Sequence, residues 1–364
     1  MNLFLQTYTP EETEGHLHTV EQAVERLPFT LAYPIAQARL KMERGEYAGM
    51  MNHILDFFEI ATQYTSCVLF KLLEKHSNNP DVSKILVGVV NKIDSKRPLS
   101  FGDWINDIFT PLCIAAGKHL PELPLVASLV EHVCNRKRNI LLGGKHDASI
   151  VQIRNEYRGH STTLSDDIYR GVSFTLEPRL LAFIKALLPL AHYDIIAFSQ
   201  GKTFSMKGAA DTTELQRTPG ADCHYCLEKD GEVIDLYPLV FLSPDRYVYV
   251  FQSLKDENIS YISSNINAVT LISDERNEDF DHALQAIVPS FDISRDLNWE
   301  ECSTLFRLES QRFMRRVYGE KKYNAELFVE RTGLTDALNE FLASDATLFP
   351  MLGEAGQGKT SQLC

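Results

Sequence analysis

Hydrophobic residues in the first half of the chain recur every three or four positions, the spacing that places them on one face of a helix. From Glu46 this spacing continues until the SNNP sequence at 77–80, which predicts one long helix. Further helices are predicted over 81–94, 100–120, 124–139, 148–158 and 177–191. Because short links join these segments, we expect a helical bundle over residues 1–193.

Polar residues and a glycine mark the ends of two of these helices. Ser100 or Asp103 suits the N-cap of the helix over 100–120, because a short side chain with an oxygen can accept a hydrogen bond from a free backbone amide. Asp147 is expected to cap the helix over 148–158, and Gly159 to end it.

After about Asp194 the period changes from 3.6 to 2, the period of half-buried strands. A Lys-Asp-Gly turn at 229–231 lies between two apolar runs, and a second turn follows at Ser243-Pro244-Asp245. These features predict a small antiparallel β-rich domain over 194–275, and apolar spacing then predicts a helical linker over 276–346. The expected fold class is therefore α+β and mainly α-helical.

Composition places the chain among ordinary globular proteins. Its 364 residues suffice for two or three domains, and 44% of them are hydrophobic and 23% charged. Since no apolar run approaches the roughly 20 residues of a membrane helix, we expect a cytoplasmic protein without a membrane partner. The seven cysteines are scattered and odd in number, which favours reduced thiols over a disulfide framework.

The net charge of −13 argues against broad binding of nucleic acid. Two local basic stretches, at 135–139 and 312–322, are still candidates for a basic site. The favoured interpretation of both is a solvated helix end or surface face.

The sequence from Gly353 to Thr360 fits the phosphate-binding pattern G-x-x-x-x-G-K-[ST]. In this pattern backbone amides surround the phosphates, the lysine neutralises them and the hydroxyl meets Mg²⁺. The predicted nucleotide-binding residues are Gly353, Gly356, Gly358, Lys359 and Thr360. The alternative is a glycine-rich tail that matches the pattern by chance.

The forty residues that end at Thr360, KKYNAELFVERTGLTDALNEFLASDATLFPMLGEAGQGKT, resemble the entry into the NTPase module of STAND ATPases, including the NACHT group. The resemblance implies that 347–364 are the first strand and Walker A loop of a truncated P-loop NTPase. It also implies that ATP and Mg²⁺ bind in a longer parent protein and that this chain alone holds no cofactor.

Arg154, Asn155 and His160 fit the motif R-N-x₄-H, and this motif resembles the signature of HEPN domains. With LAYPIAQARLKMERGEYAGMMNHILDFFEIATQYTS and SFGDWINDIF, the resemblance extends over about residues 30–192. It implies a helical bundle, a homodimer or larger homo-oligomer, and a metal-independent endoribonuclease that acts on RNA. The three motif residues are then the catalytic candidates.

Such a reaction needs few groups. When an RNA 2′-hydroxyl attacks the neighbouring phosphate, a histidine can transfer the proton and an arginine can stabilise the developing charge, without a metal. The alternative is structural: Arg154 and Asn155 would cap or bridge neighbouring helices, and His160 would hydrogen-bond a backbone carbonyl near Gly159.

Two weaker patterns are also present. Cys223 and Cys226 have the spacing of half a zinc site, but no second pair follows, so a β-hairpin turn is favoured. The carboxylate pairs Asp166/Asp167 and Asp56/Glu59 lack a third ligand and are assigned to solvated faces or helix starts.

Together these patterns predict the N-terminal effector or regulatory region of a STAND-like NTPase, of a type that resembles bacterial antiphage-defence proteins. A phage-derived trigger would release the ribonuclease in the full-length parent. One alternative is a non-catalytic HEPN-like bundle that serves as a dimerisation or partner-docking scaffold. Another is a truncated product without activity.

Overall fold

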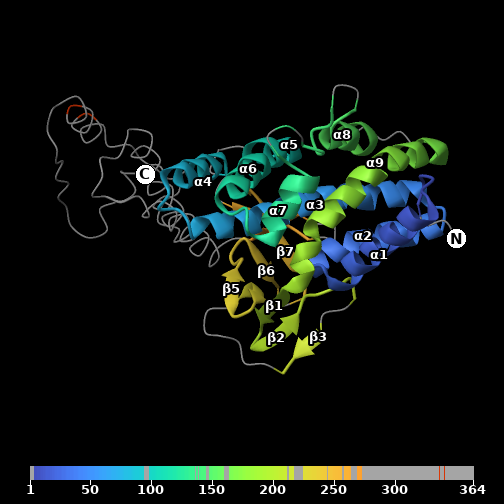
Figure 1. Ribbon diagram of the computed structural model, residues 1–364. Helices are drawn as coiled ribbons and strands as arrows, with labels where there is room; N and C mark the ends of the chain where they lie inside the picture. The colour runs from blue at the N-terminus through green and yellow to red at the C-terminus, as the bar shows by residue number, and fades with distance from the viewer. Residues whose placement is uncertain are drawn as a thin grey trace. The chain divides into compact units, whose positions relative to one another are not determined.

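The computed structural model describes residues 4–93, 98–135, 137, 139–144, 147–159, 164–210, 213–216, 224–243, 245–255, 258–263, 269–272, 336 and 340. The chain divides into two compact units, Met1–Arg295 and Asp296–Cys364. In the second unit Asp336 and Glu340 are helical and exposed. The first unit confirms the expected α+β class: helices come first, and antiparallel sheets begin at Asp194 (Figure 1).

The helices of the first unit follow one another along the chain, and the link between α7 and α8 spans residues 133–149. Their bounds are α1 (Pro10–Arg26), α2 (Phe29–Glu43), α3 (Tyr47–Glu74), α4 (Pro80–Ile93), α5 (Phe101–Asp103), the π-helix η1 (Trp104–Phe109), α6 (Thr110–His119), α7 (Pro124–His132), α8 (Ile150–Gly159), α9 (Asp166–Leu187) and the 3₁₀-helix η2 (Leu188–His192).

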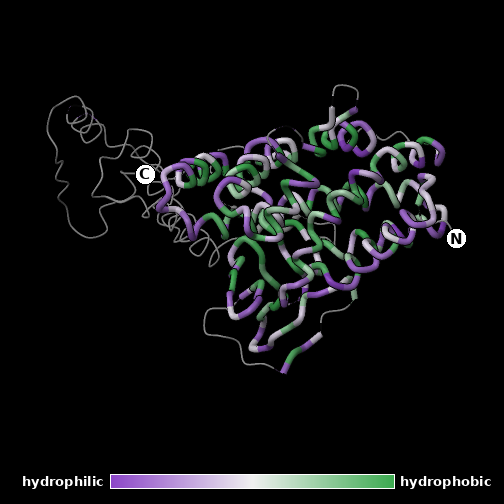
Figure 2. Tube along the Cα trace, in the orientation of Figure 1, coloured by the Kyte–Doolittle hydropathy of each residue, from purple (hydrophilic) through white to green (hydrophobic). Residues whose placement is uncertain are grey.

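The long helix α3 is the centre of the bundle and confirms the helix predicted from Glu46. It is apolar on most sides, and α2, α6, α8 and α9 all contact it. Phe57 and Phe58 pack against Phe183 of α9, with ring centroids 5.8 and 6.3 Å apart. Figure 2 shows hydrophobic and hydrophilic residues alternating along the helices around it.

The helix predicted over 100–120 is interrupted by the six-residue π-helix η1. Its start is confirmed, because Ser100 and Asp103 form a reciprocal capping box. Trp104, the first residue of η1, is 2% exposed. Its Nε1 donates a 2.8 Å hydrogen bond to the carbonyl oxygen of Gln252 in β7, so the π-helix ties the bundle to a sheet.

Helix α7 ends at His132, seven residues before the predicted end. Cys134 and Asn139 instead form an isolated antiparallel bridge that closes a tight turn. The described residues of the basic stretch, Asn135, Lys137 and Asn139, therefore lie beyond the end of α7.

At α8 the predicted cap Asp147 was wrong. Ser149 accepts a hydrogen bond from the amide of Gln152, and the Gln152 side chain accepts one from the amide of Ser149. This reciprocal capping box satisfies amides that the helix leaves free, so no cap is needed from Asp147.

Helix α9 begins eleven residues before the expected Glu177 and continues through Pro178. Proline lacks the amide that would bond the carbonyl of Phe174 four residues earlier. That carbonyl accepts a 2.9 Å hydrogen bond from Nε2 of Gln6 instead.

Two antiparallel sheets follow, where one small sheet was expected. In the first, β1 (Asp194–Ser199), β2 (Lys202–Ser205), β3 (Thr213–Leu215), β4 (Tyr225–Lys229) and β5 (Glu232–Asp235) lie in the order β3-β2-β1-β4-β5. In the second, β6 (Val240–Leu242), β7 (Val248–Lys255), β8 (Asn258–Ile262) and β9 (Val269–Ile272) lie in chain order. The predicted Lys-Asp-Gly turn is confirmed, since Asp230 and Gly231 have φ of 51° and 84° between β4 and β5.

Candidate functional site

Arg154 of the R-N-x₄-H motif lies in the middle of α8 and pairs with helix α3. Its Nη2 atom is 3.5 Å from Oε2 of Glu59. One turn further along α8, Nη2 of Arg158 is 2.6 Å from Oδ1 of Asp56. Residues three or four apart share one helix face, so two ion pairs join the same two faces. We name Asp56, Glu59, Arg154 and Arg158 the α3–α8 ion-pair cluster.

The pairs in this cluster run in opposite order along the two helices, as expected for antiparallel neighbours. The side chain of Glu59 is only 9% exposed, whereas that of Arg154 is 37% exposed. Burial raises the pKa of the Glu59 carboxyl, and the charges of Arg154 and Arg158 oppose that rise. The arginines are therefore the counter-charges of a carboxylate that has little access to water.

A histidine borders the cluster. His53 Nδ1 is 3.7 Å from Oδ2 of Asp56, on the same face of α3. Burial lowers the pKa of His53, and the charge of Asp56 opposes this shift. Both imidazole and carboxylate are about three-quarters or more buried, with side chains 25% and 16% exposed.

Asp56 and Glu59 were expected on a solvated face or at a helix start. That prediction is wrong for Glu59, which lies in the middle of α3 and is 7% exposed as a residue. The reason is α8, whose two arginines cover this side of α3. Asp166 and Asp167, in contrast, occupy the exposed first turn of α9, as predicted.

The other motif residues do not join this cluster in the described part of the chain. Asn155 is exposed on α8 and follows Arg154, which places it about 100° around the helix from the cluster. His160 lies outside the described residues, and so do the nucleotide-binding candidates Gly353, Gly356, Gly358, Lys359 and Thr360. Their predicted roles stay predictions.

The cysteine pair contains one described residue. Cys226 lies in β4, paired with Ile196 of β1, so the prediction of a hairpin turn is wrong at this residue. Its sulfur is disulfide-bonded and thus no thiolate ligand, which departs from the expected reduced state. Cys223 lies outside the described residues. Across the described ranges, no group of three His, Cys, Asp or Glu side chains could hold a metal ion.

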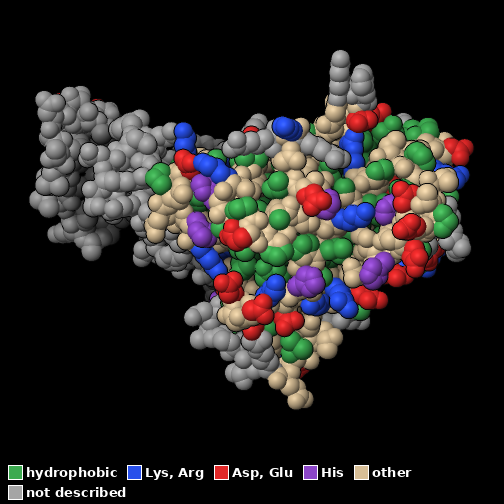
Figure 3. All heavy atoms as spheres, viewed as in Figure 1, with side chains coloured by type: hydrophobic (Ala, Val, Ile, Leu, Met, Phe, Trp, Pro, Cys, Tyr) green, Lys and Arg blue, Asp and Glu red, His purple; other side chains and the backbone are tan. Residues whose placement is uncertain are grey.

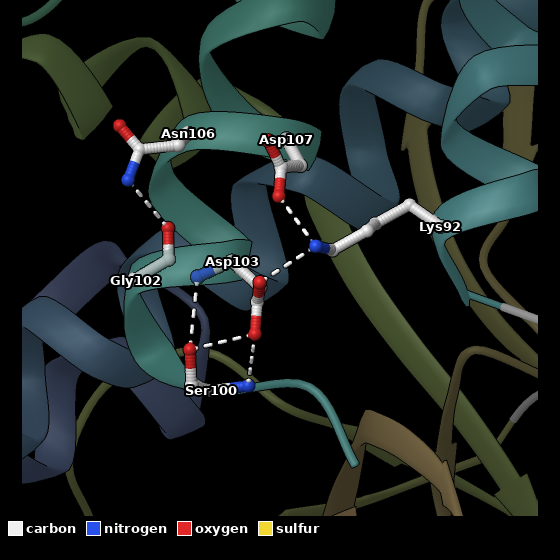
Figure 4. Close-up of polar contacts among 6 residues, drawn as sticks. All are labelled: Lys92, Ser100, Gly102, Asp103, Asn106 and Asp107. Carbon is white, nitrogen blue, oxygen red and sulfur yellow. Dashed lines mark hydrogen bonds and ion pairs between the residues drawn. The ribbon is translucent and has the colours of Figure 1, made fainter. Parts of the chain in front are cut away.

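A second charged cluster lies at η1 (Figure 4). Lys92 of α4 is 2.6 Å from a carboxylate oxygen of Asp103 and 2.6 Å from one of Asp107. Although burial opposes it, hydrogen bonds from Lys92 and Ser100 hold the pKa of Asp103 well below its usual range. Because the lysine is bound by two carboxylates, the cluster fixes η1 against α4 and leaves no free base or nucleophile.

Acidic and basic side chains are interspersed on the face of the molecule drawn in Figure 3. The described residues on this face form no continuous basic stripe of the kind expected of a non-specific nucleic-acid binder. None of the helices in the described ranges has the length and apolar character needed to cross a membrane.

Comparison of the chain with protein-family models, curated proteins and solved structures gives no match. The likeness to HEPN and STAND proteins therefore rests on the motifs alone. Sequence reasoning missed the α3–α8 ion-pair cluster, although a signal was present: acids three apart on one predicted helix and arginines four apart on another can form two pairs.

Proposed function

We propose that the helical bundle is a non-catalytic scaffold in the regulatory region of a STAND-like NTPase, the alternative that the sequence left open. The contact between Arg154 and Glu59 carries this proposal. A phosphate-binding arginine must offer its donors and its charge to the substrate. Here the charge of Arg154 faces a buried carboxylate, and Arg158 faces a second acid.

Binding of RNA at this position would carry an energetic cost. A phosphate that took over Arg154 would leave the carboxylate of Glu59 buried without its nearest counter-charge, which is strongly unfavourable. The two acids would also repel the phosphate. A role for Arg154 in holding α8 on α3 avoids both costs.

A metal-independent endoribonuclease is the second candidate, and one observation favours it. The Arg154 side chain is 37% exposed, and its guanidinium carries more donors than one carboxylate contact uses. Proton transfer would then depend on His160.

The two functions predict opposite patterns for one set of variants. Wild type, Arg154→Ala, His160→Ala and the matched control Asn155→Ala are compared for melting temperature and for cleavage of a mixed RNA pool with EDTA present. The scaffold predicts no cleavage by wild type, a lower melting temperature for Arg154→Ala, and an unchanged one for the exposed Asn155→Ala. Cleavage that Arg154→Ala and His160→Ala each reduce by about 10²–10⁴-fold at an unchanged melting temperature would establish the ribonuclease instead.

A scaffold of this kind is expected to self-associate through the surface around α8. Sedimentation of the full chain at high micromolar concentration measures this directly. A concentration-dependent dimer is expected, and a strict monomer would contradict the dimerisation role.

A further inference from the structure

A surface groove lies between α4 and α6, which pack side by side (Figure 1). Its volume is about 350 Å³, and it contains no residue of the α3–α8 ion-pair cluster. All of its described lining residues come from these two helices: Asp81, Lys84 and Ile85 from α4, and Pro111, Ile114, Ala115, Lys118 and His119 from α6. Because these positions are spaced three or four apart, each helix turns one face toward the groove.

The apolar part of the groove is aliphatic. Ile85, Pro111 and Ile114 are half-buried, and Ala115 is buried. The described lining includes no Phe, Tyr or Trp, so it offers no large aromatic ring on which a flat ligand could stack. A flexible aliphatic chain would cover this surface and remove it from water, which is favourable.

The polar side chains of the groove carry an excess of positive charge. Lys118 forms an ion pair with Asp81, and its hydrogen bond is the main reason that the pKa of this carboxyl lies below its usual value. The charges of His119 and Lys84 act on Asp81 in the same direction. Even with His119 neutral, two lysines outnumber the one acid, so this part of a chain of net charge −13 favours an anion.

An incoming anion can share these lysines without leaving an acid unsolvated. The side chains of Asp81 and Lys118 are 67% and 50% exposed, so water solvates Asp81 when Lys118 turns toward another carboxylate. Glu59 differs in this respect, because its side chain is only 9% exposed and has Arg154 as its counter-charge. The groove between α4 and α6 is therefore suited to exchange one anionic partner for another.

We propose that this groove binds a free, medium-chain aliphatic carboxylate, whose chain lies on the aliphatic residues and whose carboxylate lies near Lys84 and Lys118. Its volume of about 350 Å³ is at the lower end of the range of small-molecule sites, roughly 300–1,000 Å³. One turn of a protein helix, about 10 Å wide and about 5.4 Å long, would already exceed it. Size thus favours a small molecule over a docked helix, and the charge selects an anion.

Octanoate is the probe, and its binding to the full chain is followed by NMR of ¹³C-labelled isoleucine methyl groups. Saturable shifts are expected at Ile85 and Ile114, and none at Ile168, a 43% exposed control on α9. Octan-1-ol has the chain without the charge and acetate the charge with almost no chain, so both should bind more weakly. Hexanoate should bind less tightly than octanoate by about fourfold for each methylene removed.

Two variants test the basic residues without disturbing the core, since both lysines are exposed. Lys84→Ala and Lys118→Ala should each weaken octanoate binding by about two- to fivefold, the range expected of exposed ion pairs. Lys202→Ala is the matched control, because Lys202 is 53% exposed and pairs with Glu214 in the first sheet. It should bind octanoate as wild type does.

Several results would overturn the proposal. One is the lack of a saturable shift at Ile85 and Ile114 in the wild-type protein, which needs no variant to fold. Others are equal affinity for octanoate and octan-1-ol, or unchanged affinity in both lysine variants. Sedimentation with phosphatidylglycerol vesicles provides a further arm: no association is expected. Vesicle binding that depends on Lys84 and Lys118, without binding of octanoate, would assign the groove to a membrane surface instead.

Discussion

The α3–α8 ion-pair cluster predicts a specific energetic coupling between Arg154 and Glu59. Removing one partner of a fully buried pair costs about 3–5 kcal/mol, because it leaves an uncompensated charge. Arg154 is 37% exposed, so water offsets part of this cost, and we expect Arg154→Ala to lower the free energy of unfolding by about 2–4 kcal/mol.

Removing the charge of the other partner, Glu59, should lower the free energy of unfolding by less. Glu59→Gln removes the buried negative charge and leaves an arginine that water can reach, so we expect a loss of about 1 kcal/mol. In the Glu59→Gln background, Arg154→Ala no longer leaves an unpaired carboxylate. Urea unfolding of the two single variants and the double variant should therefore show a coupling of at least about 1 kcal/mol.

The unfolding free energy lost in Arg154→Ala should also depend on pH. The direction of this dependence follows from the titration of Glu59. Burial raises its pKa in the folded state above the unfolded value, so the folded protein binds a proton more readily than the unfolded chain. Proton binding thus stabilises the fold, and this stabilisation is lost as pH rises through the folded pKa. Without Arg154 the pKa of Glu59 in the folded state rises further. The loss of unfolding free energy caused by Arg154→Ala should therefore become smaller as the pH falls from about 7 to about 5.

Two results would refute this reasoning. The first is additivity of the two changes to within about 0.5 kcal/mol, which would mean that the contact contributes no coupling. The second is a loss of unfolding free energy in Arg154→Ala that stays the same from neutral to mildly acidic pH. Asn155→Ala, on the exposed side of the same helix, controls for a general loss of helix propensity.

Three further perturbations have expected outcomes. Glu177→Ala removes the carboxylate that accepts hydrogen bonds from the amides of residues 5 and 6, so hydrogen exchange at these amides should accelerate at least tenfold without a comparable change in the bundle core. Trp104→Phe deletes the hydrogen bond to the carbonyl of Gln252 and should lower the free energy of unfolding by about 1–3 kcal/mol in urea titrations. Lys118→Ala breaks a pair with Asp81 in which both side chains are at least half exposed, so calorimetry should show no measurable change in melting temperature.

The parts of the fold that the sequence predicted well are those set by local patterns. Helix α3 follows from an apolar period sustained over many turns, and the turn at Asp230-Gly231 follows from residues that tolerate a positive φ. Ser100 likewise caps its helix through atoms only three residues away. In each case the determining interactions lie within the segment itself.

The candidate site depended on contacts that sequence spacing does not contain. Its charge and its position on α3 suggest that Glu59 lies on the surface. In the structure it is buried, and Arg154 of α8 packs against it. The early end of α7 has the same kind of cause, because Cys134 pairs with Asn139 where helical spacing alone predicts a continued helix. In both cases, the burial of Glu59 and the end of α7, tertiary contacts override the structure that the local sequence favours.

Helix α9 shows how a distant contact can reverse a strong local signal. Proline inside a helix removes an amide and leaves a carbonyl without its partner, which is why Pro178 favours a break. The carbonyl left free belongs to Phe174, and it accepts its hydrogen bond from Gln6, 168 residues earlier in the chain. Glu177, the residue directly before Pro178, accepts hydrogen bonds from the backbone amides of Leu5 and Gln6. The N-terminal segment and the proline-containing turn thus satisfy each other's polar groups, so each stabilises the conformation of the other.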